Sequence, residues 1–132
     1  MPATMRNAVV AHFNDDQRLK GYSEDFFPNK PTLHITEEGS GEVIAVDISG
    51  LKALFFVKSL AGNRDYDVDK EAERSGLGRR IKVRFKDGET LCGYTSGYSA
   101  DRAAFFVFPG DPKGNNDRVF VVTAATEEIN FV

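Results

Sequence analysis

The sequence lacks tryptophan, has a single cysteine (Cys92) and contains no long apolar run. One cysteine excludes a disulfide bond within the chain. No apolar stretch approaches the roughly 20 residues that a membrane-spanning helix requires, and residues 1–7 lack the apolar core of a secretion signal. We therefore expect a protein of the cytoplasm that has no membrane partner.

An excess of charge of one sign is also missing. The 17 Lys and Arg residues nearly balance the 20 Asp and Glu residues, and the net charge is −3. No part of the chain is strongly basic. The electrostatic footprint of a domain that binds nucleic-acid duplexes is therefore absent.

Phenylalanine is abundant, with 11 residues. In residues 104–108 it alternates with small and β-branched neighbours, which is typical of a β-strand. The chain also repeats itself: residues 9–22 align without a gap with residues 81–94, and 44–57 align with 119–132 after three additional residues. We interpret this as a duplication, because the five identities in the first alignment fall at structurally meaningful places. They are Phe13/Phe85, Asp15/Asp87, Leu19/Leu91, Gly21/Gly93 and Tyr22/Tyr94.

The sequence of each copy predicts five short β-strands. In residues 81–86 apolar residues alternate with Lys and Arg, the period of a half-buried strand. The Asp-Gly pair at 87–88 favours a tight hairpin turn, and Asp16 at the equivalent place tolerates positive φ less well. A glycine within the next strand, Gly21 or Gly93, indicates a bend or the close approach of another strand. The remaining strands are expected near 32–36, 43–47, 51–58, 104–108, 118–123 and 127–132.

This order of strands and turns resembles the Sm-like, or SH3-type, small barrel. Residues 83–94 resemble the first Sm motif, and residues 43–57 resemble the second motif in position. The resemblance implies an all-β fold of two tandem five-stranded Sm-like barrels, one in residues 1–58 and one in residues 81–132. As a whole, the chain also resembles an uncharacterised bacterial family without an established activity.

The charged linker, residues 59–80, separates the two copies. Within it, residues 67–74 favour either a short helix or a solvated flexible connector. Each unit of about 50 residues buries so small a fraction of its surface that it would be only marginally stable alone. We therefore expect the two barrels to pack as a pseudo-twofold pair, with the remaining open strand edges offering a route to a homo-oligomer.

No group of residues predicts catalysis or a bound metal. His12 and His34 have no second histidine, cysteine or carboxylate at ligand spacing, and we interpret both as packing or solvent-facing residues. Cys92 has no paired histidine motif, which favours a structural thiol. The polar stretch 111–117 lacks the alternating acidic register and the final glutamate of a calcium loop. We therefore expect a chain that is not an enzyme and uses no metal or cofactor.

Single-stranded RNA binding is the alternative function that the Sm-like resemblance implies. In RNA-binding members an Asn of the first motif and a basic residue of the second hold the base, and Asn29 and Lys52 stand at roughly corresponding places. The flanking pattern departs from that of the family, and the second copy offers 101–102 (Asp-Arg) and 126–127 (Thr-Glu) instead. Because the net charge is also negative, RNA is the disfavoured partner.

The stretch 25–31 is the most unusual surface candidate. Two adjacent aromatic residues cannot both point inward on a strand, and the two prolines of this stretch stiffen it. It therefore forms either a docking epitope or a plug between the two copies. The sequence favours a non-catalytic interaction or regulatory module whose partner is a protein or a small ligand. Its candidate interaction surface is Phe26, Phe27, Pro28, Asn29 and Lys30.

Overall fold

The computed structural model describes residues 6–62, 69, 72–74 and 76–132. This part of the chain contains ten β-strands, two 3₁₀ helices and no α-helix, which confirms the all-β class. The helix considered for 67–74 falls largely outside the described residues. The first half of the chain forms β1 (Asn7–Phe13), β2 (Arg18–Ser23), β3 (Thr32–Glu37), β4 (Val43–Asp47), η1 (Ile48–Gly50) and β5 (Leu51–Val57). The second half forms β6 (Arg79–Phe85), β7 (Thr90–Thr95), β8 (Ala104–Val107), β9 (Asn116–Val122), η2 (Thr123–Ala125) and β10 (Thr126–Phe131).

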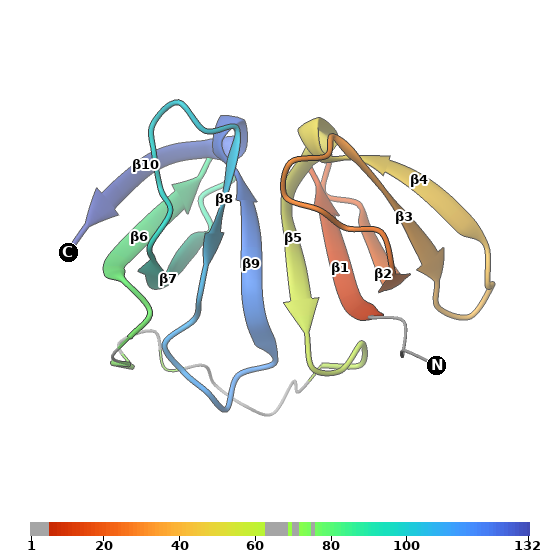
Figure 1. Cartoon of the computed structure of the whole chain (residues 1–132), viewed down its shortest axis with the longest axis horizontal. Helices are drawn as coiled ribbons and strands as arrows, with labels where there is room; N and C mark the ends of the chain where they lie inside the picture. Colours follow the sequence, from red (N-terminus) through yellow and green to blue (C-terminus); the bar gives the residue numbers. More distant parts are fainter. Residues whose placement is uncertain (1–5, 63–68, 70–71, 75) are drawn as a thin grey trace.

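The strands form two antiparallel sheets (Figure 1). The larger sheet has seven strands in the order β4-β3-β2-β1-β5-β9-β8, and the smaller has three in the order β10-β6-β7. The first half therefore contributes five neighbouring strands of the larger sheet, which β9 and β8 of the second half complete. β5 and β9 lie side by side at the centre of the molecule, and their pairing joins the two halves.

The strand register of the first half recurs in the second. Val9 of β1 pairs with Gly21 of β2, and Ile81 of β6 pairs with Gly93 of β7. Each of these partners is shifted by 72 residues. The pairings of β1 with β5 and of β6 with β10 also correspond, with a register shift at the same place in both. The two aligned segments of the sequence thus occupy equivalent positions in their hairpins.

The sequence predicted two five-stranded barrels, but neither half closes into a barrel. β4 pairs only with β3, while β5 pairs with β1 and β9, so the first half stays open between β4 and β5. In the second half β8 joins β7 through the bridge between Tyr94 and Phe108. The reason is that the outer edge of β5, which closure would require, has its hydrogen-bonding groups satisfied by β9.

The predicted pseudo-twofold packing is also wrong. Under a twofold axis, the pairing of β5 with β9 would require the reciprocal pairing of β10 with β4, whereas among the described strands β4 pairs only with β3 and β10 only with β6. The composition of the strands explains this choice. β5 is buried along its whole length, and residues 119–122 of β9 are buried and apolar. In contrast, β10 carries the exposed Glu127, Glu128 and Asn130 and could not cover β5 with an apolar surface.

Apolar side chains pack on both faces of the shared sheet. Successive residues of a strand point to opposite faces, so Leu54 and Phe56 of β5 belong to one core cluster and Phe55 to the other. Each cluster includes residues of both halves: Phe120 lies in the first and Val121 in the second. Both cores are therefore shared between the two halves.

Two glycines lie directly against neighbouring backbone, which confirms the close approach that the sequence predicted. A β-carbon on Gly21 would lie 2.1 Å from the carbonyl oxygen of Thr36. One on Gly93 would lie 2.5 Å from the carbonyl oxygen of Phe108. A side chain is thus sterically excluded at both positions.

Candidate functional site

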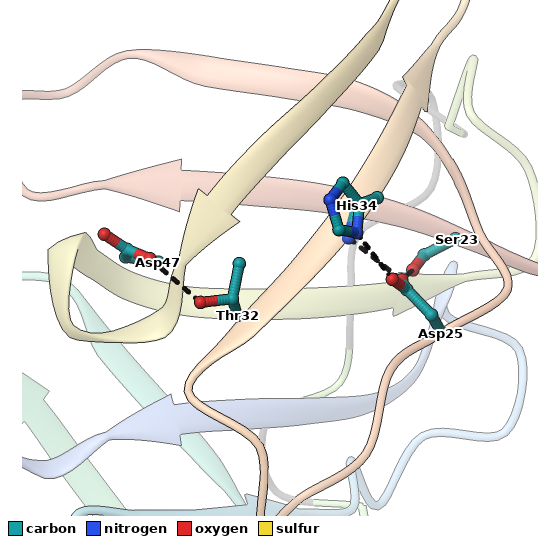
Figure 2. Close-up of polar contacts among 5 residues, drawn as sticks. All are labelled: Ser23, Asp25, Thr32, His34 and Asp47. Atoms are coloured by element: carbon teal, nitrogen blue, oxygen red, sulfur yellow. Dashed lines mark hydrogen bonds and ion pairs between the residues drawn. The ribbon is translucent and has the colours of Figure 1, made fainter.

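The loop of residues 24–31 connects β2 to β3 and is anchored at its start by Asp25. The Ser23 hydroxyl (3.2 Å) and the His34 amide (2.9 Å) donate hydrogen bonds to Asp25 Oδ1, and His34 Nδ1 lies 2.7 Å from Oδ2 (Figure 2). Burial alone would raise the pKa of Asp25. The hydrogen bonds from the His34 amide, the His34 ring and the Ser23 hydroxyl outweigh burial and lower the pKa below its usual value. Asp25 is therefore ionised at neutral pH and holds the loop against β3.

The far end of the loop is held against β4. The Ile48 amide donates a hydrogen bond to the Pro31 carbonyl (2.9 Å). Beside it, the Thr32 hydroxyl donates to the Asp47 carboxylate (3.0 Å), also shown in Figure 2. With both ends tied and two prolines in its sequence, the loop presents a preformed surface.

Ser23, Asp25 and His34 do not have the arrangement of a hydrolase triad. In such a triad the histidine lies between the nucleophilic hydroxyl and the carboxylate, whereas here the carboxylate lies between the other two groups. The group fits a role in holding the loop. Within the described part of the chain, no three His, Cys, Asp or Glu side chains lie close enough together to hold a metal ion. That the chain is not an enzyme stays a prediction.

The two adjacent phenylalanines lie in a loop and not on the strand from which the sequence argument started, but their surroundings do differ. Phe26 is half-buried, and its ring lies edge-on to those of Phe56 (5.0 Å between centroids), Phe106 (6.0 Å) and Phe120 (5.1 Å). Phe106 and Phe120 belong to the second half of the chain. Phe27 is 50% exposed. Phe26 is thus a contact between the halves, and Phe27 is a surface residue.

A groove of about 750 Å³ lies beside this aromatic contact. The first half contributes one wall, made of residues 28–31, Ile48 and Ser49. The second half contributes the opposite wall, made of residues 102–106, Phe120, Val122 and Ala124. The lining residues are mostly apolar, and Lys30 and Arg102 are the charged ones: Pro28, Asn29, Lys30, Pro31, Ile48, Ser49, Arg102, Ala103, Ala104, Phe105, Phe106, Phe120, Val122 and Ala124.

The groove includes three of the five residues predicted as an interaction surface. Pro28, Asn29 and Lys30 line it, whereas Phe26 packs between the halves and Phe27 lies outside the lining. On the opposite wall, Arg102 was expected only as part of the second copy's counterpart to the RNA-binding positions and not as part of the interaction surface. The signal that links it to this surface is its separation from Lys30 by the same 72 residues that relate the two aligned segments.

Comparison with known proteins assigns the chain to a family. The model of a family of unknown function, DUF6982, matches residues 5–132. The chain belongs to DUF6982. Comparison with curated proteins and with solved structures finds no significant match. In the described part of this DUF6982 member, no helix has the length and apolar character to cross a membrane.

Lys52, the second residue considered for RNA binding, lies in a different place. It is buried on β5, and its ammonium group lies 2.7 Å from Asp87 and 2.5 Å from Glu89. Burial alone would lower the pKa of Lys52, but the hydrogen bonds that its ammonium group donates to the two carboxylates outweigh burial and raise the pKa. Lys52 thus stays charged and links the two halves of this DUF6982 chain. Asn29 lines the groove and Lys52 does not, so the two residues considered for RNA binding do not line the same groove.

We expect His12 to make the stability of the fold depend on pH. Its ring packs against Phe55 (4.3 Å between centroids), and burial, aided by Arg18, lowers its pKa from 6.5 to about 4. Between these values the unfolded chain binds a proton that the folded chain excludes. The free energy of unfolding should therefore fall as the pH falls through this window, by at most about 3 kcal/mol.

Urea denaturation from pH 7 to pH 4 tests this expectation. The variant His12→Phe keeps an aromatic ring against Phe55 and removes the titrating group. It should lose less stability than the wild type over the window, since the carboxylates titrate in both proteins. Equal losses in the two proteins would contradict the expectation.

Proposed function

We propose that this DUF6982 chain is a non-catalytic binding module that takes a small ligand in the groove between its halves. The observation that carries the proposal is the groove itself: about 750 Å³, largely apolar, with two charged side chains. Sites for small molecules are typically of 300–1,000 Å³ and mostly apolar, with a few polar groups that orient the ligand. The anchored loop supports the proposal, because a preformed wall lowers the entropic cost of binding.

A small ligand fits the surface better than a protein partner does. A stable protein interface covers about 800 Å² on each partner and has an apolar centre. The large apolar residues exposed in the described part of the chain are Phe27, Val43 and Val132. Val43 begins β4 and Val132 follows β10, at opposite ends of the molecule (Figure 1). These residues do not form one patch, so a protein partner is the second candidate.

We also propose that each half is an opened unit of the Sm-like type. The support is the strand register, which recurs between the halves with the shift seen in the sequence. RNA binding remains the disfavoured alternative. Lys52 is engaged by Asp87 and Glu89, and the net charge of −3 opposes a polyanion.

Fluorescence of N-phenylnaphthylamine, a neutral apolar dye, tests the groove. Dye emission should rise on adding the protein, because the apolar lining excludes water from the dye. Ala104→Trp would fill the groove and should abolish most of the rise. The matched control is Ala45→Trp, on the exposed part of β4 away from the groove, which should bind as the wild type does. Unchanged binding by Ala104→Trp would overturn the proposal.

A further inference from the structure

We infer that the ligand of this groove is an apolar molecule with one anionic end, of the class of medium-chain fatty acids. This inference rests on the proposed function and adds the chemical class of the ligand. Two features carry it: the charges that line the groove have one sign, and the surface between them is apolar.

The charged side chains of the groove lining are both cationic, and Asp101, which interacts electrostatically with Arg102, is not among the lining residues. Lys30 and Arg102 line the groove, and no Asp or Glu is among the described residues that do so. Neither side chain forms an ion pair with an acidic residue of the described chain. In a chain with a net charge of −3, this is a local excess of cations that an anionic group would complement.

Hydrogen bonds hold the backbone that carries each cation, and the Lys30 ammonium lies 4.7 Å from the centroid of the Phe27 ring. The Lys30 amide donates a hydrogen bond to the Phe27 carbonyl (3.0 Å), in the turn between the two prolines of the loop. On the opposite wall, the Arg102 amide donates to the Ser99 carbonyl (3.0 Å), and the Arg102 carbonyl accepts from the Thr123 hydroxyl (2.8 Å). The two charges are thus presented from anchored segments, which favours a defined position for the anionic end.

The rest of the groove lining is mostly apolar and favours a ligand with an apolar body. Several lining residues have no side chain that can form a hydrogen bond: Ala104, Phe106, Phe120 and Val122. A compact polar anion such as phosphate would therefore leave this apolar surface in contact with water. A neutral apolar molecule would use that surface but not the cations. A carboxylate on an alkyl chain uses both, and a groove of about 750 Å³ has room for a chain of medium length.

Competition for the bound dye by decanoate and by decanol tests the inference, since the two molecules differ in the charged end. Decanoate should displace N-phenylnaphthylamine from the wild type at about tenfold lower concentration than decanol. Lys30→Met and Arg102→Met should each weaken decanoate about two- to fivefold and leave decanol unchanged, which is the upper range for an exposed ion pair. Lys20→Met removes the same charge from the exposed part of β2 and should affect neither competitor.

The outcomes separate this inference from the proposed function. If decanoate and decanol compete equally, or if Lys30→Met and Arg102→Met bind decanoate as tightly as the wild type, the anionic class is overturned and the groove stands. If decanoate fails to displace the dye at all, the fatty-acid class is likewise overturned. If the dye binds Ala104→Trp as well as the wild type, the groove itself is rejected.

Discussion

Replacing Gly93 by alanine is expected to lower the free energy of unfolding by about 3 kcal/mol, the sum of a steric clash and weakened hydrogen bonds. The new β-carbon would lie 2.5 Å from the Phe108 carbonyl oxygen and 2.8 Å from a methyl group of Val107. Relief requires β7 and β8 to move apart. These strands are joined by the bridge between Tyr94 and Phe108, through two hydrogen bonds of 2.8 Å, and by the Thr95 hydroxyl, which donates to the Phe106 carbonyl (2.8 Å). The clash therefore falls on the contact that connects the two sheets.

Gly21→Ala should be at least as costly, because its β-carbon would lie 2.1 Å from a backbone oxygen. The control is Gly50→Ala, where nothing lies within 4 Å and φ is not positive. Gly50→Ala should change the free energy of unfolding by less than about 0.5 kcal/mol, the usual range for a surface change. Urea denaturation measures all three variants. A loss below about 1 kcal/mol for Gly93→Ala would show that the strands separate at little cost.

These glycines illustrate which parts of the fold the sequence predicts. A glycine within a β-pattern has few explanations, and close backbone approach is one of them. The hairpin turns follow in the same way, since positive φ occurs at Gly88 and at the equivalent Asp16. The glycines and the hairpin turns can be predicted from residues close in sequence and from the 72-residue shift between the halves. The sequence alone is sufficient to identify these two signals.

The partner of β5 could not be predicted by the same reasoning. Alternation along a strand identifies its buried face but not which distant strand borders its edge. The run Leu51–Val57 is almost continuously apolar, a pattern typical of a strand buried on both faces. That pattern is typical of a central strand, and β5 lies between β1 and β9 in the larger sheet. The expectation of barrels came from the order of the strands, and this order is compatible with an open sheet as well.

Only the first-half wall of the groove, with Pro28, Asn29 and Lys30, could be predicted as an interaction surface. The aromatic pair Phe26 and Phe27 was expected to divide between a covered and an exposed position, because neighbouring side chains on an extended backbone point apart. The bond between Asp25 and His34 was not predicted, since a loop separates the two residues and neither belongs to a recognisable motif. The position of Arg102 in the groove depends on the pairing of β5 with β9, which places the second half next to the loop.

Phe26→Ala is expected to lower the free energy of unfolding by about 3 kcal/mol, near the lower end for truncation of a buried phenylalanine, because Phe26 is only half-buried. Its ring contacts Phe56 of β5 together with Phe106 and Phe120 of the second half, so the truncation leaves a cavity where the halves meet. Phe27→Ala should stay within about 0.5 kcal/mol of the wild type, since half of Phe27 is already exposed to solvent.

The pair Phe26 and Phe27 is a matched test, because both variants remove the same ring from adjacent positions of one loop. Urea unfolding gives the two stabilities, and Phe26→Leu, which retains part of the apolar volume, should fall between Phe26→Ala and the wild type. A double-mutant cycle with Phe120→Leu should give a coupling of about 1 kcal/mol if the two rings stabilise the same contact. If the losses of Phe26→Ala and Phe120→Leu simply add, the loop does not join the halves through this ring. If Phe27→Ala is as unstable as Phe26→Ala, the whole loop is a structural plug and Phe27 is not available as a surface for a partner.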